Sequence, residues 1–227
     1  MKILALECSA GPASAAVVEN GRVIASDFTN VKMTHSQTLL PMVKSVLEGA
    51  GLSVNDIDAL AISNGPGSFT GIRIGISAVK GIAAPRKLPC YAVSTLRAIA
   101  ENFAYFEGIV CPVMDARCNQ VYNALFKAEK GKLTRLCEDR ALMTDELLQE
   151  LERFSENIMI VGDGAGLFEK YANKKIAVAD EEKRYQNAVS VALAAEECEA
   201  AMPDKLMPFY LRLPQAEREL KAKKGDR

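Results

Sequence analysis

The sequence of 227 residues has no tryptophan and one histidine, His35. One imidazole cannot build a His-x-x-x-His zinc site, and it leaves a Ser-His or Cys-His catalytic pair only His35 as its base. No apolar run approaches the roughly 20 residues that span a bilayer, and the first residues lack an apolar stretch of signal-peptide length. We therefore expect a cytoplasmic protein that does not bind membranes.

The six cysteines form no C-x-x-C pair and follow no disulfide framework, so we expect free thiols. The formal net charge is only −1. Phosphate contacts need a surplus of lysine and arginine, so the charge argues against a protein that binds nucleic acid by itself.

The composition, 49% hydrophobic and 25% charged, is that of a globular chain with one large domain or two small ones. Hydrophobic periodicity predicts the elements of the first half. They are strands at 2–8, 14–19, 22–27, 58–64 and 90–93, helices at 35–48 and 70–84, and a helix that starts at Ser94 or Thr95 and runs to about Phe103. The pair Asn20-Gly21 between the second and third strands is typical of a tight hairpin turn.

The second half repeats this plan. We predict strands at 109–115, 120–128, 132–137, 158–161 and 176–178, and helices at 144–154 (capped by Thr144), 166–171 and 187–201. Three antiparallel strands followed by helix, strand, helix and strand make a ribonuclease-H-like unit. Two such units predict an α/β fold of two lobes, each a mixed sheet with helices, as in the actin, hexokinase and Hsp70 (ASKHA) superfamily. We expect lobes at 1–104 and 105–212, and a charged tail at 213–227 that is a frayed helix or disordered.

A glycine-rich loop, Asn64-Gly-Pro-Gly-Ser-Phe-Thr-Gly71, follows a predicted strand and opens a predicted helix. One interpretation is an anion nest, in which free backbone N–H groups face a phosphate. The other is a tight turn where the helix packs close to the sheet. The loop lacks the Gly-Lys-Ser/Thr of a Walker motif, and its glycine spacing is not that of the dinucleotide fingerprint.

Two carboxylates, Glu7 and Asp115, end the first strand of each half. In actin-like phosphotransferases, carboxylates at these places hold a metal and orient the attacking group. The loop 162–166 lies where such folds cradle adenosine. A vestigial nucleotide or anion site would therefore comprise Glu7, Ser9, Gly65, Gly67, Asp115, Gly162 and Gly164. This pattern leaves an ATP-binding enzyme of the actin-like superfamily as the alternative function, and solvated strand ends and glycine turns as the structural interpretation.

The helix predicted at 70–84 has two apolar faces. The first carries Ile72, Ile76, Val79 and Ala83, and the second carries Gly71, Gly75, Ala78 and Ile82. Two apolar faces need two covers. Small residues four apart let another backbone approach closely, so the second cover is either the helix at 35–48 or another chain.

Seven blocks of the sequence carry a family resemblance. They are KILALECSAGPASAAVVENGRVI, HSQTLLPMV, ISNGPGSFTGIRIGISAVKGIA, YAVSTLRAIA, MDARCNQVYNALF, VGDGA and PFYLR. They resemble the TsaB (YeaZ) family, accessory proteins of bacterial tRNA threonylcarbamoyladenosine synthesis, over residues 1–212, and GPGSFTGIRIG is the most specific stretch. The chain departs from the family at Glu7-Cys8, where members more often have Asp-Thr.

The resemblance implies a non-catalytic scaffold that binds and activates TsaD. That partner carries metal and nucleotide, and transfers a threonylcarbamoyl group to adenosine 37 of tRNAs that read codons starting with A. Thr95 and Ile99 stand where the partner has its metal-binding histidines, so the resemblance implies no metal, no cofactor on this chain alone and no protease activity. The ATPase TsaE is expected in the complex, and tRNA is expected to bind only through it.

The family also forms homodimers, and it binds TsaD through helices of the first half. By position these are the helices at 35–48 and 70–84. The interface residues that we expect are His35, Leu39, Leu40, Val43, Gly71, Ile74, Gly75, Ala78 and Ile82. The homodimer and TsaD surfaces should overlap, so that binding the partner breaks the self-dimer. Independent tRNA binding through Arg73, Lys80, Arg86 and Lys87 stays open as a third hypothesis.

Overall fold

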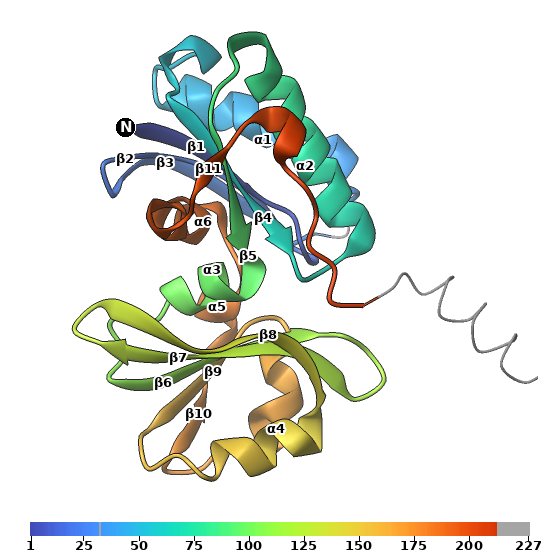
Figure 1. Cartoon of the computed structure of the whole chain (residues 1–227), viewed down its shortest axis with the longest axis vertical. Helices are drawn as coiled ribbons and strands as arrows, with labels where there is room; N and C mark the ends of the chain where they lie inside the picture. Colours follow the sequence, from blue (N-terminus) through green and yellow to red (C-terminus); the bar gives the residue numbers. More distant parts are fainter. Residues whose placement is uncertain (32, 213–227) are drawn as a thin grey trace, which may run out of the picture.

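The computed structural model describes residues 1–31 and 33–212, which form two mixed β-sheets with helices against their faces (Figure 1). The first sheet has the strand order β11-β5-β4-β1-β2-β3. Its strands are β1 (Lys2–Glu7), β2 (Ala13–Glu19), β3 (Arg22–Thr29), β4 (Ala59–Gly65), β5 (Cys90–Ser94) and β11 (Ala200–Ala201). Strand β1 pairs antiparallel with β2 and parallel with β4. The turn between β2 and β3 is the predicted one, because Asn20 and Gly21 both have positive φ, 50° and 77°.

The second sheet repeats this arrangement, with the order β10-β9-β6-β7-β8. Its strands are β6 (Gly108–Asp115), β7 (Gln120–Glu129), β8 (Lys132–Met143), β9 (Ile158–Val161) and β10 (Ile176–Val178). Strand β6 pairs antiparallel with β7 and parallel with β9, as β1 does with β2 and β4. The prediction of a duplicated unit, in which three antiparallel strands are followed by helix, strand, helix and strand, is confirmed.

Helices cover both faces of the first sheet. Helices α1 (His35–Gly49) and α2 (Phe69–Ala83) lie on one face and α6 (Ala188–Ala194) on the other (Figure 1). Successive side chains of a strand point to opposite faces. Leu4 of β1 therefore packs with α1 and α2, whereas Ile3 packs with α6.

The two sheets share apolar contacts through α3 (Thr95–Glu101), which lies between them (Figure 1). Leu96 and Ile99 of α3 pack in one cluster with Phe126 of β7. The far side of the second sheet is covered by α4 (Thr144–Leu151) and the 3-10 helix η3 (Ala165–Tyr171). The remaining helical turns are η1 (Val54–Asp56), η2 (Ala84–Arg86), α5 (Glu181–Arg184), η4 (Ala195–Glu197) and η5 (Pro203–Lys205). In the described part of the chain, no helix has the length and apolar character needed to cross a membrane.

The last described segment differs from its prediction. The helix expected over 187–201 ends at Ala194, and the chain then turns into β11, which pairs antiparallel with β5. Residues 188–206 thus pack on the first sheet, although we expected 105–212 to form the second lobe. The physical reason is burial: Val191 and its alanine neighbours cover an apolar face of the first sheet, and that face becomes continuous only after β1, β2 and β4 have paired.

Two local predictions in the second half are also corrected. Strand β8 continues to Met143 instead of ending at Cys137, because its pairing with β7 resumes beyond two register shifts and ends with Met143 opposite Gln120. Thr144 does not cap α4: it is the first helical residue, and its Oγ1 donates to the Asn119 carbonyl at 2.9 Å. The charged tail expected at 213–227 lies outside the described residues.

Candidate functional site

Helix α2 lies so close to the first sheet that two of its glycines have no room for a side chain. A Cβ on Gly71 would lie 2.1 Å from the Cys8 carbonyl oxygen. A Cβ on Gly75 would lie 2.6 Å from the Cys8 sulfur and 2.8 Å from Cδ1 of Ile62. The prediction that Gly71 and Gly75 form an open interface is therefore wrong, because the sheet of the same chain already covers them.

The outer side of α1 and α2 carries a shallow groove of about 450 Å³. It is lined by His35, Ser36, Leu39, Leu40, Arg73, Ile74, Ser77 and Ala78. Leu40 is 53% exposed, and Ile74 and Ala78 are half-buried. The other two expected interface residues do not line this groove: Val43 is buried in the first core, and Ile82 is half-buried against that core. The groove therefore retains five of the nine expected interface residues.

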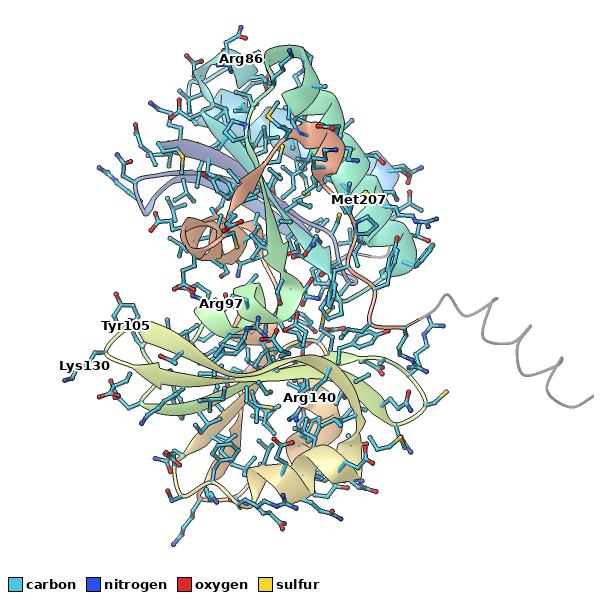
Figure 2. All side chains as sticks on the ribbon, viewed as in Figure 1. Arg86, Arg97, Tyr105, Lys130, Arg140 and Met207 are labelled. Carbon is cyan, nitrogen blue, oxygen red and sulfur yellow. The ribbon has the colours of Figure 1, made fainter. Side chains whose placement is uncertain are left out.

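Residues 202–212 form a strap along α2 that the hydrophobic pattern did not predict. Arg73 of α2 donates from Nε to the Tyr210 hydroxyl at 2.8 Å. The Tyr210 ring stacks on Phe69 with 4.4 Å between centroids, and the Arg73 guanidinium carbon lies 3.8 Å from the Phe69 centroid. Met207 lies beside α2 and is 64% exposed (Figure 2). The only sequence signal for this strap is the PFYLR block.

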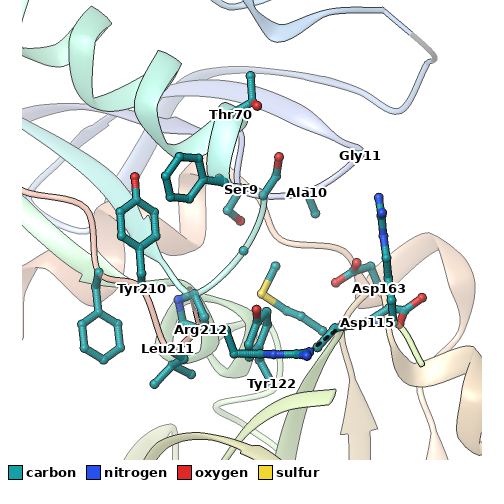
Figure 3. A pocket seen from close by; sticks show the side chains of 18 residues that line it. Ser9, Ala10, Gly11, Thr70, Asp115, Tyr122, Asp163, Tyr210, Leu211 and Arg212 are labelled. Carbon is teal, nitrogen blue, oxygen red and sulfur yellow. Dashed lines mark hydrogen bonds between the residues drawn. The ribbon is translucent and has the colours of Figure 1, made fainter. Parts of the chain in front are cut away.

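A second cavity, of about 560 Å³, lies between the two lobes (Figure 3). Three of the seven residues expected at a vestigial nucleotide site line it: Ser9, Gly67 and Asp115. Figure 3 shows Asp115 and Asp163 on one side of the cavity and Tyr210 on the other. The cleft thus gathers the ends of β1 and β6, the glycine-rich loop and the end of the strap.

Glu7 does not line the cleft, although it ends β1. Its side chain is fully buried, and its Oε1 accepts a hydrogen bond from the Ser9 backbone N–H at 2.5 Å. Its Oε2 accepts from the Ser63 hydroxyl. Burial raises the pKa of Glu7, and the bonds from Ser63 and Ser9 oppose part of that rise. With both oxygens bonded inside the lobe, Glu7 braces the ends of β1 and β4 and does not face a ligand.

The glycine-rich loop before α2 is a tight turn whose backbone touches two other segments. A Cβ on Gly65 would lie 2.1 Å from the Phe209 carbonyl oxygen, and one on Gly67 would lie 2.4 Å from the Ser9 carbonyl oxygen. The Ser68 N–H donates to that same Ser9 oxygen at 2.6 Å. Because the chain itself occupies these approaches, the structure favours the tight-turn interpretation over the anion nest.

The second glycine loop behaves in the same way and places one acid in the cleft. A Cβ on Gly162 would lie 2.0 Å from the Val113 carbonyl oxygen, and one on Gly164 would lie 2.9 Å from the Asp115 nitrogen. Asp163 between them lines the cleft, and no group of the described residues hydrogen-bonds its Oδ1. Burial raises the pKa of Asp163 to about 7. The sequence gives no signal for Asp163 beyond its place between two glycines.

Possible metal ligands and basic residues are dispersed. Within residues 1–31 and 33–212, no three His, Cys, Asp or Glu side chains come together as a metal site. Thr95 and Ile99 are fully buried, and Ile99 lies in the apolar cluster between the sheets.

Most of the four basic residues considered for tRNA are engaged within the chain. Lys80 donates to the Asp204 carbonyl at 3.4 Å, and Arg73 bonds the strap. Arg86, at the far end of α2, donates to the Ile57 carbonyl at 3.0 Å (Figure 2). Lys87 is exposed in the turn that follows. Three of the four are thus bonded to their own chain.

Comparison with known proteins relates the chain to one pathway. The family model described as TsaD, tRNA N6-adenosine threonylcarbamoyltransferase, matches residues 24–219. The tRNA threonylcarbamoyladenosine biosynthesis protein TsaB of Bacillus subtilis (strain 168) is 31% identical over 221 residues, which is 96% of each chain. The protein of the same name from Escherichia coli (strain K12) is 36% identical over 167 residues, 72% of each chain.

A solved structure extends the similarity to the fold. The structure described as YeaZ from Pseudomonas aeruginosa has a TM-score of 0.76 and 28% sequence identity. The match covers 92% of this chain and 99% of that chain. The likeness therefore spans both sheets.

Proposed function

The chain belongs to the TsaB family of tRNA threonylcarbamoyladenosine biosynthesis proteins, and we propose that it serves this pathway as a non-catalytic subunit that binds TsaD. The observation that carries the proposal is the groove on α1 and α2, where exposed Leu40 lies beside half-buried Ile74 and Ala78. Specific interfaces combine such an apolar centre with a polar rim. Here Ser36, Ser77 and Arg73 supply the rim.

The positions at which a reacting group or a metal ligand was expected support a subunit that contributes neither. Glu7, the expected metal-orienting carboxylate, is bonded at both oxygens by Ser9 and Ser63. Thr95 and Ile99, at the positions of the partner's metal-binding histidines, are buried and bear no imidazole. We therefore place ATP and metal on the partners and none on this chain.

The choice of TsaD as the partner rests on shared architecture. The family model that matches most of this chain is described as a threonylcarbamoyltransferase, so TsaD offers a layer equivalent to α1 and α2. Two such layers can pack as a pseudo-symmetric pair, and two copies of this chain can pack in the same way. Self-association and TsaD binding would then compete for Leu40 and its neighbours. We include TsaE as a third protein, with tRNA reaching the assembly through TsaD.

Light scattering coupled to size exclusion tests the proposal, with this chain alone, with TsaD of the same organism, and with TsaE and ATP added. We expect a self-dimer that gives way to a complex with TsaD. The variant Leu40→Asp places a carboxylate at the centre of the groove and should weaken both associations by about 2 kcal/mol or more, as loss of a central anchor does.

The matched control is Ser45→Asp, which adds the same charge to an exposed position of α1 outside the groove. It should bind as the unchanged chain does. If Leu40→Asp bound TsaD as well as the unchanged chain does, this groove would be excluded as the binding surface. Failure to form any complex, even with TsaE and ATP, would contradict the subunit assignment.

A further inference from the structure

The start of α1 is weakly fixed by its own sequence. Among the described residues, the side chain of the N-cap residue Thr34 caps no backbone N–H of the helix. Pro41 lies inside α1 and has no N–H to donate to the Gln37 carbonyl. The first turn thus lacks both a side-chain cap and one helical hydrogen bond. Its position must depend on tertiary contacts.

His35, the first residue of α1, makes such a contact. Its Nε2 donates to the Ala10 carbonyl oxygen at 2.7 Å. The same ring lies against the first turn of α2, because a Cβ on Gly71 would lie 3.2 Å from Cδ2 of His35. One half-buried side chain therefore joins α1, α2 and the loop after β1. It also lines the groove on α1 and α2 that is proposed to bind TsaD, called the docking groove below.

The loop that accepts this bond is itself braced on both sides. The Ser9 N–H is held by buried Glu7, and the Ser9 carbonyl accepts from Ser68 at the start of α2. The neighbouring Ala10 carbonyl is thus an anchor of fixed position. A rigid acceptor gives the His35 hydrogen bond the geometry needed to hold a helix end in place.

We propose that His35 is a positioning residue for the docking groove: it fixes the first turn of α1 against Ala10 and the start of α2, and so sets the spacing of Leu40 and Ile74. The proposal rests on the assignment of this groove as the TsaD-binding surface. A preordered groove binds more tightly, because less side-chain and helix-end entropy is lost on association. Since Ala10 also lines the interlobe cleft, the same hydrogen bond ties the wall of the cleft to the groove.

Two variants at this position and one control test the proposal. His35→Ala removes the bond, and His35→Gln keeps an N–H at nearly the same reach. Gln37→Ala alters an exposed residue of the same turn that does not line the groove. For each protein we would measure TsaD affinity, the urea midpoint of unfolding, and amide hydrogen exchange in the first turn of α1.

We expect His35→Ala to bind TsaD about tenfold more weakly, the size of effect that one lost buried hydrogen bond gives. Exchange in the first turn should rise in the same variant. His35→Gln should restore both readouts toward those of the unchanged chain, and Gln37→Ala should alter neither. A merely structural histidine would instead lower the urea midpoint in both His35 variants and leave the affinity of the folded protein unchanged.

The proposal is overturned if His35→Ala binds TsaD as the unchanged chain does, or if His35→Gln is as impaired as His35→Ala. Leu40→Asp separates this failure from failure of the docking surface. If Leu40→Asp abolishes binding while His35→Ala does not, only the positioning role is lost. If both bind normally, the groove is not the TsaD surface, and the proposed positioning role falls with it.

Discussion

Two alanine substitutions in α2 measure how tightly this helix is pressed against the first sheet. In Gly75→Ala the new Cβ would lie 2.6 Å from the Cys8 sulfur and 2.8 Å from Cδ1 of Ile62, closer than carbon atoms normally approach. Overpacking of this kind costs about 1–3 kcal/mol, and replacing a helical glycine by alanine returns about 1 kcal/mol. We expect net destabilisation of up to about 2 kcal/mol.

Gly81 provides the matched control in the same helix. A Cβ there meets no heavy atom within 4 Å, and the residue is exposed. Gly81→Ala should therefore stabilise the protein by up to about 1 kcal/mol through helix propensity and a less flexible unfolded chain. The two variants, chemically identical changes six residues apart, should move stability in opposite directions.

Urea unfolding followed by far-ultraviolet circular dichroism suits this comparison, because the chain has no tryptophan to report by fluorescence. Adding Cys8→Ala to Gly75→Ala removes the sulfur from the crowded site, and the pair should show a favourable coupling energy. If Gly75→Ala stabilised the protein as Gly81→Ala does, the close contact with the sheet would be refuted. The small face of α2 would then again be available to another chain.

Three further predictions concern the cleft and the thiols. The pKa of Asp163 is raised to about 7, so its protonated carboxyl contributes stability that is fully present below about pH 4 and is lost as the pH rises through 7. In urea unfolding, Asp163→Asn should therefore gain stability relative to the unchanged chain between pH 5 and pH 8. A pH-independent difference would contradict this. All six cysteines are free, as predicted. A thiol reagent should modify exposed Cys118 first. Burial raises the pKa of the Cys8 and Cys111 thiols and should delay their modification until the protein unfolds. Calorimetric titration with Mg-ATP should give no binding heat, because Glu7 and the glycine-rich loop are engaged within the chain; saturable heat would favour the ATP-binding alternative.

Much of the fold could be predicted because its signals are local. The strand and helix order of each half follows from hydrophobic periods of two and 3.6 residues. The turn at Asn20-Gly21 follows from the positive φ that these residues tolerate. Repetition of that order was enough to identify two equivalent units. The seven sequence blocks that resemble the TsaB family indicated the pathway, which hydrophobic periodicity cannot indicate.

The return of the chain to the first sheet could not be predicted in this way. Strand β11 has only two residues, and its pairing with β5 joins positions more than a hundred residues apart. The strap depends on equally remote contacts, such as the Arg73–Tyr210 hydrogen bond. A local hydrophobic pattern does not indicate which distant segments pair, since each segment alone is compatible with several partners.

The candidate site also has features that the sequence predicts and others that depend on contacts between distant segments. Three features can be predicted from the residues alone: α2 has a face of small residues, Glu7 and Asp115 end equivalent strands, and two glycine loops follow strands. Tertiary packing is what brings Gly71 and Gly75 against Cys8 instead of another chain, and what encloses Glu7 while it leaves Asp115 exposed. The reason is that a small side chain or a carboxylate has the same local chemistry wherever it lies. What it contacts depends on which distant segments fold against it.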